Sequence, residues 1–278
     1  MPMNIEFTKM QGLGNDFVVI DGISQVIDLS TEQVQFIADR RFGVGCDQLL
    51  LVERPQSAQA EFRYRIFNAD GGEVQQCGNG ARCFARFVFE QGLTTNTEIP
   101  VETAGGLIVL KLEADGQVTV NMGVPDFVPA SLPFIADTQA KSYPLQTSQG
   151  ELEISAVSMG NPHVVLHVED VDTAAVDILG AEIERHSRFP QRVNVGFMQI
   201  VSAESIRLRV YERGAAETLA CGTGACAAVA VGRQLGELGD CVKVSLPGGE
   251  LVIRWQGEHE PLFMTGPATR VFEGKMTL

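Results

Sequence analysis

Two cysteines each begin a short glycine-rich turn, CGNGARC at Cys77 and CGTGAC at Cys221. We expect a helix to follow each turn, which places each cysteine just ahead of a first helical turn. The backbone N–H groups and the helix dipole at such a place bind an anion, either a ligand carboxylate or a thiolate. A thiol pKa of about 8.5 can fall there by one to several units. The pattern predicts two activated thiols; the alternative is two small buried residues at tight turns.

Two thiols that face the same carbon suit inversion of its configuration. One thiolate removes a proton from one face, and the other thiol returns a proton to the opposite face. Two such groups are needed because a single base tends to restore the original hand. The N–H groups of both turns would also bind a substrate carboxylate and stabilise the charge that develops on it.

Three other uses of the cysteines are weaker. Zinc sites use closely spaced ligand pairs, whereas the cysteines that follow Cys77 and Cys221 come six and five residues later, inside the expected helices. A structural disulfide between these two is a further alternative, but six cysteines in 278 residues are too few for a disulfide scaffold. A P-loop is excluded because no Gly-Lys-Ser/Thr follows the glycines. The remaining cysteines are expected to be packing residues: Cys46, Cys83, Cys226 and Cys241.

Both turns belong to an internal repeat. Residues 62–77 (FRYRIFNADGGEVQQC) and residues 206–221 (IRLRVYERGAAETLAC) align without a gap at a constant offset of 144. Weaker matches upstream, at an offset of 146, pair Gly14 with Gly160 and Gln48 with Asn194. Several features in the same order at nearly the same offset predict two homologous halves.

Strand patterns dominate both halves. We expect strands at residues 4–7, 17–21, 62–67, 107–112, 117–121, 163–167, 206–211, 242–246 and 250–255. Glycine and aspartate turns between several of them suit antiparallel hairpins. The helix after Cys221 is apolar nearly all round until Arg233, so it should be buried on most sides. Each half is therefore expected to be a curled, mostly antiparallel sheet around a central helix, in an α+β fold of two pseudo-symmetric domains.

The join between the halves is expected where four prolines interrupt the periodic pattern between residues 121 and 150. We therefore predict an N-terminal domain of residues 1–121 and a C-terminal domain of residues 122–266. Pseudo-symmetric halves commonly place equivalent loops face to face, so we expect the active site in the cleft between the domains.

Composition excludes several classes of partner. A formal net charge of −14 predicts a surface that repels phosphate backbones, so no nucleic-acid partner is expected. No apolar run reaches the roughly 18 residues of a membrane helix, so no membrane association is expected. The first residues, with Glu6, Lys9 and Asp16, lack the pattern of a secretory signal. We expect a soluble, cytoplasmic protein.

Five motifs are similar to those of a known family: GLGNDF at Gly12, NADGGEVQQCGNGARC at Asn68, GNPH at Gly160, VNVGF at Val193 and YERGAAETLACGTGAC at Tyr211. Over its whole length the chain resembles the diaminopimelate epimerases. These enzymes of bacterial lysine and peptidoglycan biosynthesis interconvert LL- and meso-diaminopimelate without pyridoxal phosphate or metal. The resemblance implies two similar α+β domains with the site in the cleft, a last strand at residues 267–278 that returns to the N-terminal domain, no cofactor, and a homodimer.

The resemblance also implies roles for individual residues. Cys77 and Cys221 correspond to the acid/base pair; from LL to meso, Cys221 would accept the proton and Cys77 donate one. His163 and Glu212 would help to set the protonation of the cysteines. The carboxylate at the reacting centre would meet backbone N–H groups of Gly78, Asn79, Gly222 and Thr223. The other substrate contacts, mainly to the unreactive end, would come from Asn15, Gln48, Asn68, Asn161, Asn194, Glu212 and Arg213.

The chemistry of these side chains agrees with such a ligand. Arg213 can bind a carboxylate in a bidentate pair, Glu212 can accept from an ammonium, and neutral amides suit a zwitterion. Taken alone, each has an ordinary structural explanation. Arg213 could form a surface ion pair and His163 could be a satisfied core residue, while three asparagines could be turn formers: Asn15, Asn79 and Asn161.

The sequence departs from the family pattern at two positions. Ala216 stands where a glycine is expected, which would cost stability if the backbone there has a positive φ. Phe272 stands where some members have a tyrosine at the dimer contact. Two rival functions stay open: another cofactor-independent epimerase, such as a proline racemase, and a noncatalytic amino-acid-binding protein. The first would have little use for Glu212 and Arg213, and the second would not need the cysteines.

Overall fold

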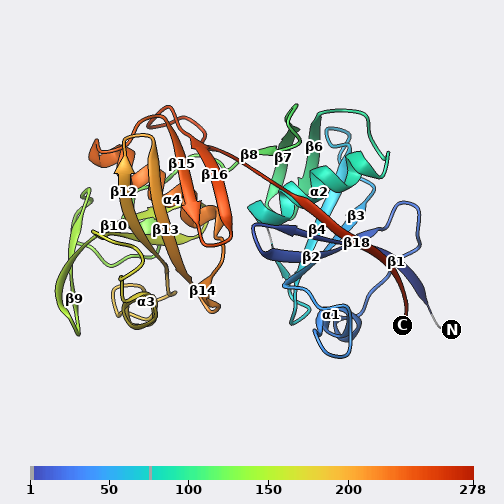
Figure 1. Cartoon of the computed structure of the whole chain (residues 1–278), viewed down its shortest axis with the longest axis horizontal. Coiled ribbons are helices and arrows are strands. Elements are labelled where there is room, and N and C mark those ends of the chain that lie inside the picture. Colours follow the sequence, from blue (N-terminus) through green and yellow to red (C-terminus); the bar gives the residue numbers. More distant parts are fainter. Residues whose placement is uncertain (1–2, 75–76) are drawn as a thin grey trace. The chain divides into compact units, whose positions relative to one another are not determined.

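A computed structural model describes residues 3–74 and 77–278 of the chain. Gln75 and Gln76, inside the first copy of the repeat, lie outside the described residues. The chain divides into two compact units, each with its own sheet and buried helix (Figure 1). Unit 1 comprises Met1–Val120 and Gly266–Leu278, and unit 2 comprises Asn121–Thr265.

Unit 1 is a mixed sheet around one long helix. Its elements are β1 (Asn4–Gly12), β2 (Asn15–Asp21), α1 (Thr31–Ala38), β3 (Gln48–Glu53), β4 (Phe62–Asn68), β5 (Glu73–Val74), α2 (Gly78–Glu90), β6 (Glu98–Thr103), β7 (Gly106–Leu112), β8 (Val118–Asn121) and β18 (Thr269–Thr277). The strand order is β18-β1-β2-β3-β4-β6-β7-β8, with β5 paired to β4. The pairs β2–β3 and β4–β6 are parallel, and the other pairs named here are antiparallel.

Unit 2 repeats this topology. Its elements are η1 (Pro129–Ser131), β9 (Tyr143–Thr147), β10 (Gly150–Ser158), β11 (Pro162–His167), α3 (Val176–Glu184), β12 (Asn194–Ser202), β13 (Ser205–Glu212), β14 (Ala216–Thr218), α4 (Gly222–Leu235), β15 (Cys241–Leu246), β16 (Gly249–Arg254) and β17 (Phe263–Gly266). The order is β9-β10-β11-β12-β13-β15-β16-β17, with β14 on β13. The parallel pairs β11–β12 and β13–β15 occupy the same places as those of unit 1. The expected α+β fold with a helix inside each sheet is confirmed.

The two long helices form because apolar residues follow each glycine-rich turn. On α2, Phe84, Phe87 and Val88 are buried against the sheet, and the chain leaves the helix at Gly92, whose φ is 67°. On α4, residues 224–232 are buried on all sides, and the helix ends at Gly236, whose φ is 85°. Each helix therefore forms the centre of its unit and presents its N-terminus at a fixed place.

The last strand completes unit 1. β18 pairs antiparallel with β1, from Asn4 opposite Thr277 to Gln11 opposite Thr269, as the red and blue strands show in Figure 1. Just before it, the carbonyl of Pro267 accepts a 3.0 Å hydrogen bond from the buried Arg82 of α2. None of the described helices is long and apolar enough to cross a membrane.

Candidate active site

Cys77 is the residue before the first turn of α2. Its backbone is extended (φ −146°, ψ 116°), and its sulfur accepts a 3.5 Å hydrogen bond from the backbone N–H of Gly80. Its thiol donates to the side-chain oxygen of Asn15 at 3.8 Å, and the same oxygen accepts from the amide of Asn79 at 3.3 Å. A side chain at position 80 would collide with the Tyr64 hydroxyl, which would lie 2.4 Å from its Cβ. The glycine therefore permits the close approach that puts Cys77 at this helix end.

Two further predicted site residues of unit 1 contact each other. Gln48 and Asn68 are opposite one another on β3 and β4, and the Gln48 amide donates to the Asn68 oxygen at 2.8 Å. Both side chains are half-buried. Gln48 also lies opposite Phe17 on β2, and Asn15 comes two residues before Phe17 on the same strand. Unit 1 thus gathers polar amides near the start of α2.

Cys221 holds the equivalent place before α4 and is 4% exposed. Its thiol donates to Oε2 of Glu212 at 3.0 Å, and the Thr223 hydroxyl lies 3.6 Å from the sulfur. The other carboxylate oxygen of Glu212 accepts from the Thr218 hydroxyl. Burial, and then the negative charge of Glu212, raise the pKa of Cys221 well above its usual range. The lowered pKa expected at this helix N-terminus is therefore wrong for Cys221, since burial and the carboxylate outweigh the helix end.

His163 is joined to Cys221 through two side chains. The Asn161 amide donates to the Thr223 hydroxyl oxygen at 3.3 Å, so the Asn161 oxygen accepts from Nε2 of His163 at 3.0 Å. Burial, with a smaller contribution from the charge of Arg213, lowers the pKa of His163 to about 3. The imidazole is therefore neutral at physiological pH, with its proton on Nε2.

Asn194 connects the strand of His163 to Arg213. It lies opposite His163 in the parallel pair β11–β12. Its amide donates to the carbonyl of Pro162 at 2.9 Å, and its oxygen accepts from the backbone N–H of Arg213 at 2.9 Å. The Arg213 side chain is exposed, and its guanidinium donates to the carbonyl of Gln191 at 3.3 Å. The structure thus brings the predicted residues of unit 2 into one group around the start of α4, and those of unit 1 into another around α2.

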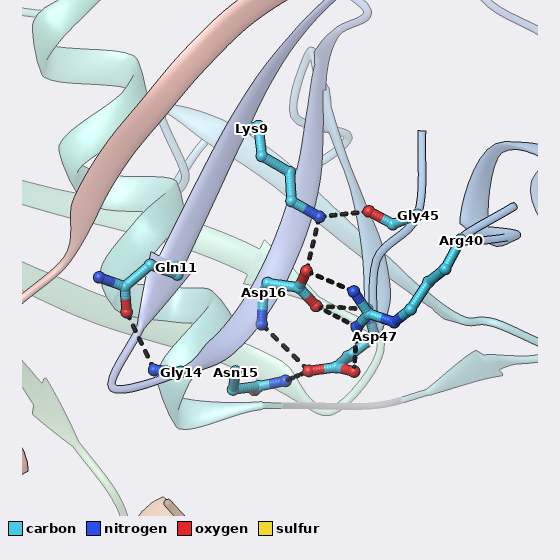
Figure 2. A network of polar contacts seen from close by, with 8 residues as sticks. All are labelled: Lys9, Gln11, Gly14, Asn15, Asp16, Arg40, Gly45 and Asp47. Atoms are coloured by element: carbon cyan, nitrogen blue, oxygen red, sulfur yellow. Dashed lines mark hydrogen bonds and ion pairs between the residues drawn. The ribbon is translucent and has the colours of Figure 1, made fainter. Parts of the chain in front are cut away.

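Sequence reasoning missed a charged network beside Asn15 (Figure 2). Lys9 donates to Asp16 at 2.6 Å and also to the carbonyl of Gly45. Arg40 donates to both oxygens of Asp16, at 2.7 and 2.9 Å, and to Asp47 at 2.7 Å. Burial raises the pKa of Asp16, but the hydrogen bonds from Arg40 and Lys9 outweigh it and lower that pKa well below the usual range. The sequence carried one signal of this network: Asp16 follows Asn15 and Asp47 precedes Gln48, and both Asn15 and Gln48 were predicted to bind substrate.

A second missed residue is Thr218, which fixes the Glu212 carboxylate. It lies on β14, the short strand that pairs with β13 and brings Tyr211 opposite Glu217.

Among the described residues, no group of three or more His, Cys, Asp or Glu side chains is placed to bind a metal ion.

Known proteins are similar to this chain over nearly its whole length. The diaminopimelate epimerase family matches residues 7–128 and 155–271. A diaminopimelate epimerase of Thioalkalivibrio sulfidiphilus is 63% identical over 99% of this chain and 100% of its own, and one of Nitrosospira multiformis is 59% identical over 99% of each.

Solved structures share the fold at low sequence identity. A hydroxyproline epimerase from Agrobacterium vitis has a TM-score of 0.71 at 18% identity, covering 99% of this chain and 93% of its own. A PhzF-family phenazine biosynthesis protein of Bacillus anthracis has a TM-score of 0.69 at 17% identity, covering 99% of each chain. The matches over nearly the full length, with the cysteine-led turns at the starts of two equivalent helices, show that this chain belongs to the diaminopimelate epimerase family.

Proposed function

We propose that this chain interconverts LL- and meso-diaminopimelate by a two-cysteine acid/base reaction that uses neither pyridoxal phosphate nor a metal. The observation that supports it most is the position of Cys221, whose thiol donates its hydrogen bond to Glu212 at 3.0 Å. A carboxylate at that place can take the thiol proton and leave a thiolate base. Cys77 occupies the equivalent helix end in the other copy of the repeat, beside a neutral amide.

The reaction in the LL-to-meso direction runs in three steps. Glu212 takes the thiol proton of Cys221, and the resulting thiolate removes the proton from one α-carbon. The electron pair of the broken C–H bond moves onto the adjacent carboxylate. Cys77 then gives its proton to the opposite face of the carbon, and the new C–H bond uses that electron pair. The proposal requires the two thiols to face opposite sides of the same carbon, and the reverse reaction exchanges their roles.

The substrate carboxylate at the reacting carbon would bind to backbone N–H groups at the two helix N-termini, where charge develops during the reaction. These groups belong to Gly78, Asn79, Gly222 and Thr223. The polar side chains would bind the rest of the zwitterion, with Arg213 on the distal carboxylate and Glu212 on an ammonium. The amides proposed to complete this set are those of Asn15, Gln48, Asn68, Asn161 and Asn194.

His163 would act as a neutral positioning residue. With its pKa lowered to about 3, it donates from Nε2 and fixes the Asn161 amide, which in turn fixes the Thr223 hydroxyl near Cys221. The hydroxyl oxygen accepts from Asn161, which leaves its hydrogen free to stabilise the Cys221 thiolate.

We also propose a cytoplasmic homodimer that serves lysine and peptidoglycan precursor synthesis. Val271 and Phe272 on β18 are 56% and 47% exposed, an apolar pair that a partner copy would cover. Light scattering at micromolar concentration tests this, and a monomer mass would contradict it. Phe272→Ser should weaken the dimer more than a change at the exposed Ile178 of unit 2.

Proton exchange at the α-carbon is the direct test of the reaction. The reduced protein is incubated with LL-diaminopimelate in deuterium oxide, and the α-proton signal is followed by NMR. We expect the signal to disappear as meso product accumulates with solvent deuterium. Cys77→Ala and Cys221→Ala should each slow epimerisation by at least about 100-fold, whereas Cys241→Ala, at an exposed thiol on β15, should not.

Three outcomes of this test would contradict the proposal. Turnover of proline but not of diaminopimelate would replace the substrate. Full turnover by Cys77→Ala would refute the two-base mechanism. Absence of exchange by the reduced wild type with any amino acid would favour a noncatalytic binding protein.

A further inference from the structure

The Asn15 amide bridges a carboxylate and a thiol. Its nitrogen donates to Oδ2 of Asp47 at 2.9 Å, and its oxygen faces the Cys77 thiol at 3.8 Å. A carboxylate only accepts hydrogen bonds, so the atom that faces Asp47 has to be the nitrogen. The oxygen must then face Cys77, where it accepts from a protonated thiol and would repel a thiolate.

Asp47 itself is fixed by several contacts (Figure 2). Its Oδ1 accepts from Arg40 at 2.7 Å, and its Oδ2 accepts from the backbone N–H of Asp16 at 3.1 Å. Its own N–H donates to Oδ1 of Asp16 at 2.9 Å. Asp16 is anchored in turn by Lys9, which is only 8% exposed. The Asp47 carboxylate is therefore held in place by a charged network that is anchored at the buried Lys9.

The second unit lacks this arrangement at the equivalent place. Asn161 corresponds to Asn15, but its nitrogen donates to a hydroxyl and its oxygen accepts from His163. The position that corresponds to Asp47, at the same offset of 146, is the buried apolar Val193. In the described part of the chain, the carboxylate-anchored amide therefore belongs to the side of Cys77.

We propose that Asp47 is a positioning residue for the reaction: it fixes the Asn15 amide with its oxygen toward Cys77 and so keeps Cys77 as a protonated proton donor at rest. This inference rests on the proposed role of Cys77. It gives a physical reason for the two equivalent thiols to take different roles, since one faces a neutral acceptor and the other a carboxylate that can take its proton.

The other titratable groups recorded around Cys77 are neutral at assay pH. Burial raises the pKa of the Tyr64 phenol well above its usual range and that of the Cys83 thiol to about 12. The charged groups recorded on this side are those of the network, Lys9, Asp16, Arg40 and Asp47, and the buried Arg82 of α2, which donates to the carbonyl of Gly78 at 3.5 Å and is unchanged in the variants below. A change in Cys77 ionisation on substituting Asp47 can therefore be assigned to the amide or to the lost charge, and a second variant separates these.

The test measures the alkylation of Cys77 against pH in Asp47→Asn. The protein reacts with iodoacetamide, and mass spectrometry of the digest follows the Cys77 peptide, with the Cys241 peptide as an internal reference. The new amide lets Asn15 rotate and donate to the sulfur, which stabilises the thiolate. We expect the midpoint of alkylation to fall by about one pH unit and the rate at neutral pH to rise about tenfold.

The matched control is Asp172→Asn. Asp172 is an exposed carboxylate in unit 2 that also pairs with an arginine, Arg207, at 2.7 Å. This variant should leave Cys77 alkylation unchanged. A midpoint that stays constant or rises in natively folded Asp47→Asn would overturn the proposal.

The variant Asn15→Ala distinguishes an effect that passes through the Asn15 amide from a direct effect of the lost Asp47 charge. In that background Asp47→Asn should cause no further shift, and a shift as large as in the wild type would overturn the route through Asn15. If Asp47→Asn does not fold, Asp47→Ser should shift the midpoint in the same direction, because a hydroxyl can donate to the Asn15 oxygen and so lets the amide turn its nitrogen toward the sulfur, and no shift would count against the proposal. The readout needs no turnover, so failure of the proposed function would show separately, as a wild type without diaminopimelate exchange.

Discussion

The Glu212 carboxylate lies 3.0 Å from the Cys221 sulfur and receives the hydrogen bond of its thiol. Thr218 binds the second carboxylate oxygen, so Glu212 cannot turn away without losing a partner. Glu212 ends β13 and Cys221 precedes α4, and the short strand β14 brings them together. A base and its proton acceptor are thereby fixed by local backbone structure.

Glu212→Gln should slow epimerisation by at least about 100-fold, because the amide cannot take the Cys221 proton. The same change removes a negative charge, so Cys221 should become alkylated at lower pH than in the wild type. Thr218→Val, which keeps the carboxylate, should cost less activity. Steady-state rates together with peptide alkylation check both effects, and unchanged turnover in Glu212→Gln would refute the assigned role.

The pH dependence of kcat/KM follows from the raised pKa of Cys221. Because burial and Glu212 disfavour the thiolate, the active fraction should increase as pH rises toward that pKa. At still higher pH the rate should fall as the proton-donating thiol ionises, which gives a bell-shaped profile. A flat profile between about pH 6 and about pH 9 would contradict a two-thiol mechanism.

His163 should not titrate in the physiological range, since its pKa is lowered to about 3. An unperturbed histidine changes charge near pH 6.5, so NMR signals of the His163 ring should stay constant from about pH 8 to about pH 5. A histidine peptide in the same sample provides the reference. Movement of the His163 signals together with that reference would show that the imidazole ionises and is not a neutral donor.

Ala216→Gly should stabilise unit 2. Ala216 has a φ of 61°, a left-handed conformation that costs a residue with a Cβ roughly 1–2 kcal/mol. After the added flexibility of glycine in the unfolded chain, we expect a net gain of about 0.5–1 kcal/mol in the free energy of unfolding. The neighbouring Ala215, which has no positive φ, gives the control: Ala215→Gly should be neutral or destabilising. Denaturant unfolding of both variants distinguishes strain from a general effect of glycine.

Asp16→Asn should destabilise unit 1 by about 3 kcal/mol, because it leaves the buried Lys9 without its counter-charge. The pKa of Asp16 is lowered in the folded chain, so its contribution is present above the unfolded value of about 3.9 and is lost as pH falls below it. The wild type should therefore lose more stability than Asp16→Asn on acidification below about pH 4. Asp172→Asn, which breaks an exposed pair, should cost less than about 1 kcal/mol.

Alternating apolar residues made nine strands predictable from the sequence, and the apolar residues after the two glycine-rich turns made both central helices predictable. The structure adds strands that alternation does not mark, such as Gln48–Glu53, where a continuous apolar run buried on both faces is compatible with either a helix or a strand. The short helices Thr31–Ala38 and Val176–Glu184 were also missed, since helices of eight and nine residues show little periodicity.

The site was predictable only in part. The two cysteines stand out by repetition, and the amides by resemblance to a family. The network around Asp47 depends on the parallel pairing of β2 with β3 and on a loop that turns Arg40 back toward Asp16. Neither the register nor the loop leaves a local pattern in the sequence, so this part of the arrangement emerges only in three dimensions.

The pairing of β18 with β1 has a consequence for synthesis on the ribosome. Unit 2 is one continuous stretch, whereas β1, which pairs with β2 on one side, gains its second neighbour β18 only after all of unit 2 has been translated. Until then the nascent first unit exposes an unpaired strand edge, the kind of surface that promotes aggregation. The order of translation thus makes the unit that is begun first the one that is finished last, and chaperone demand should concentrate on it.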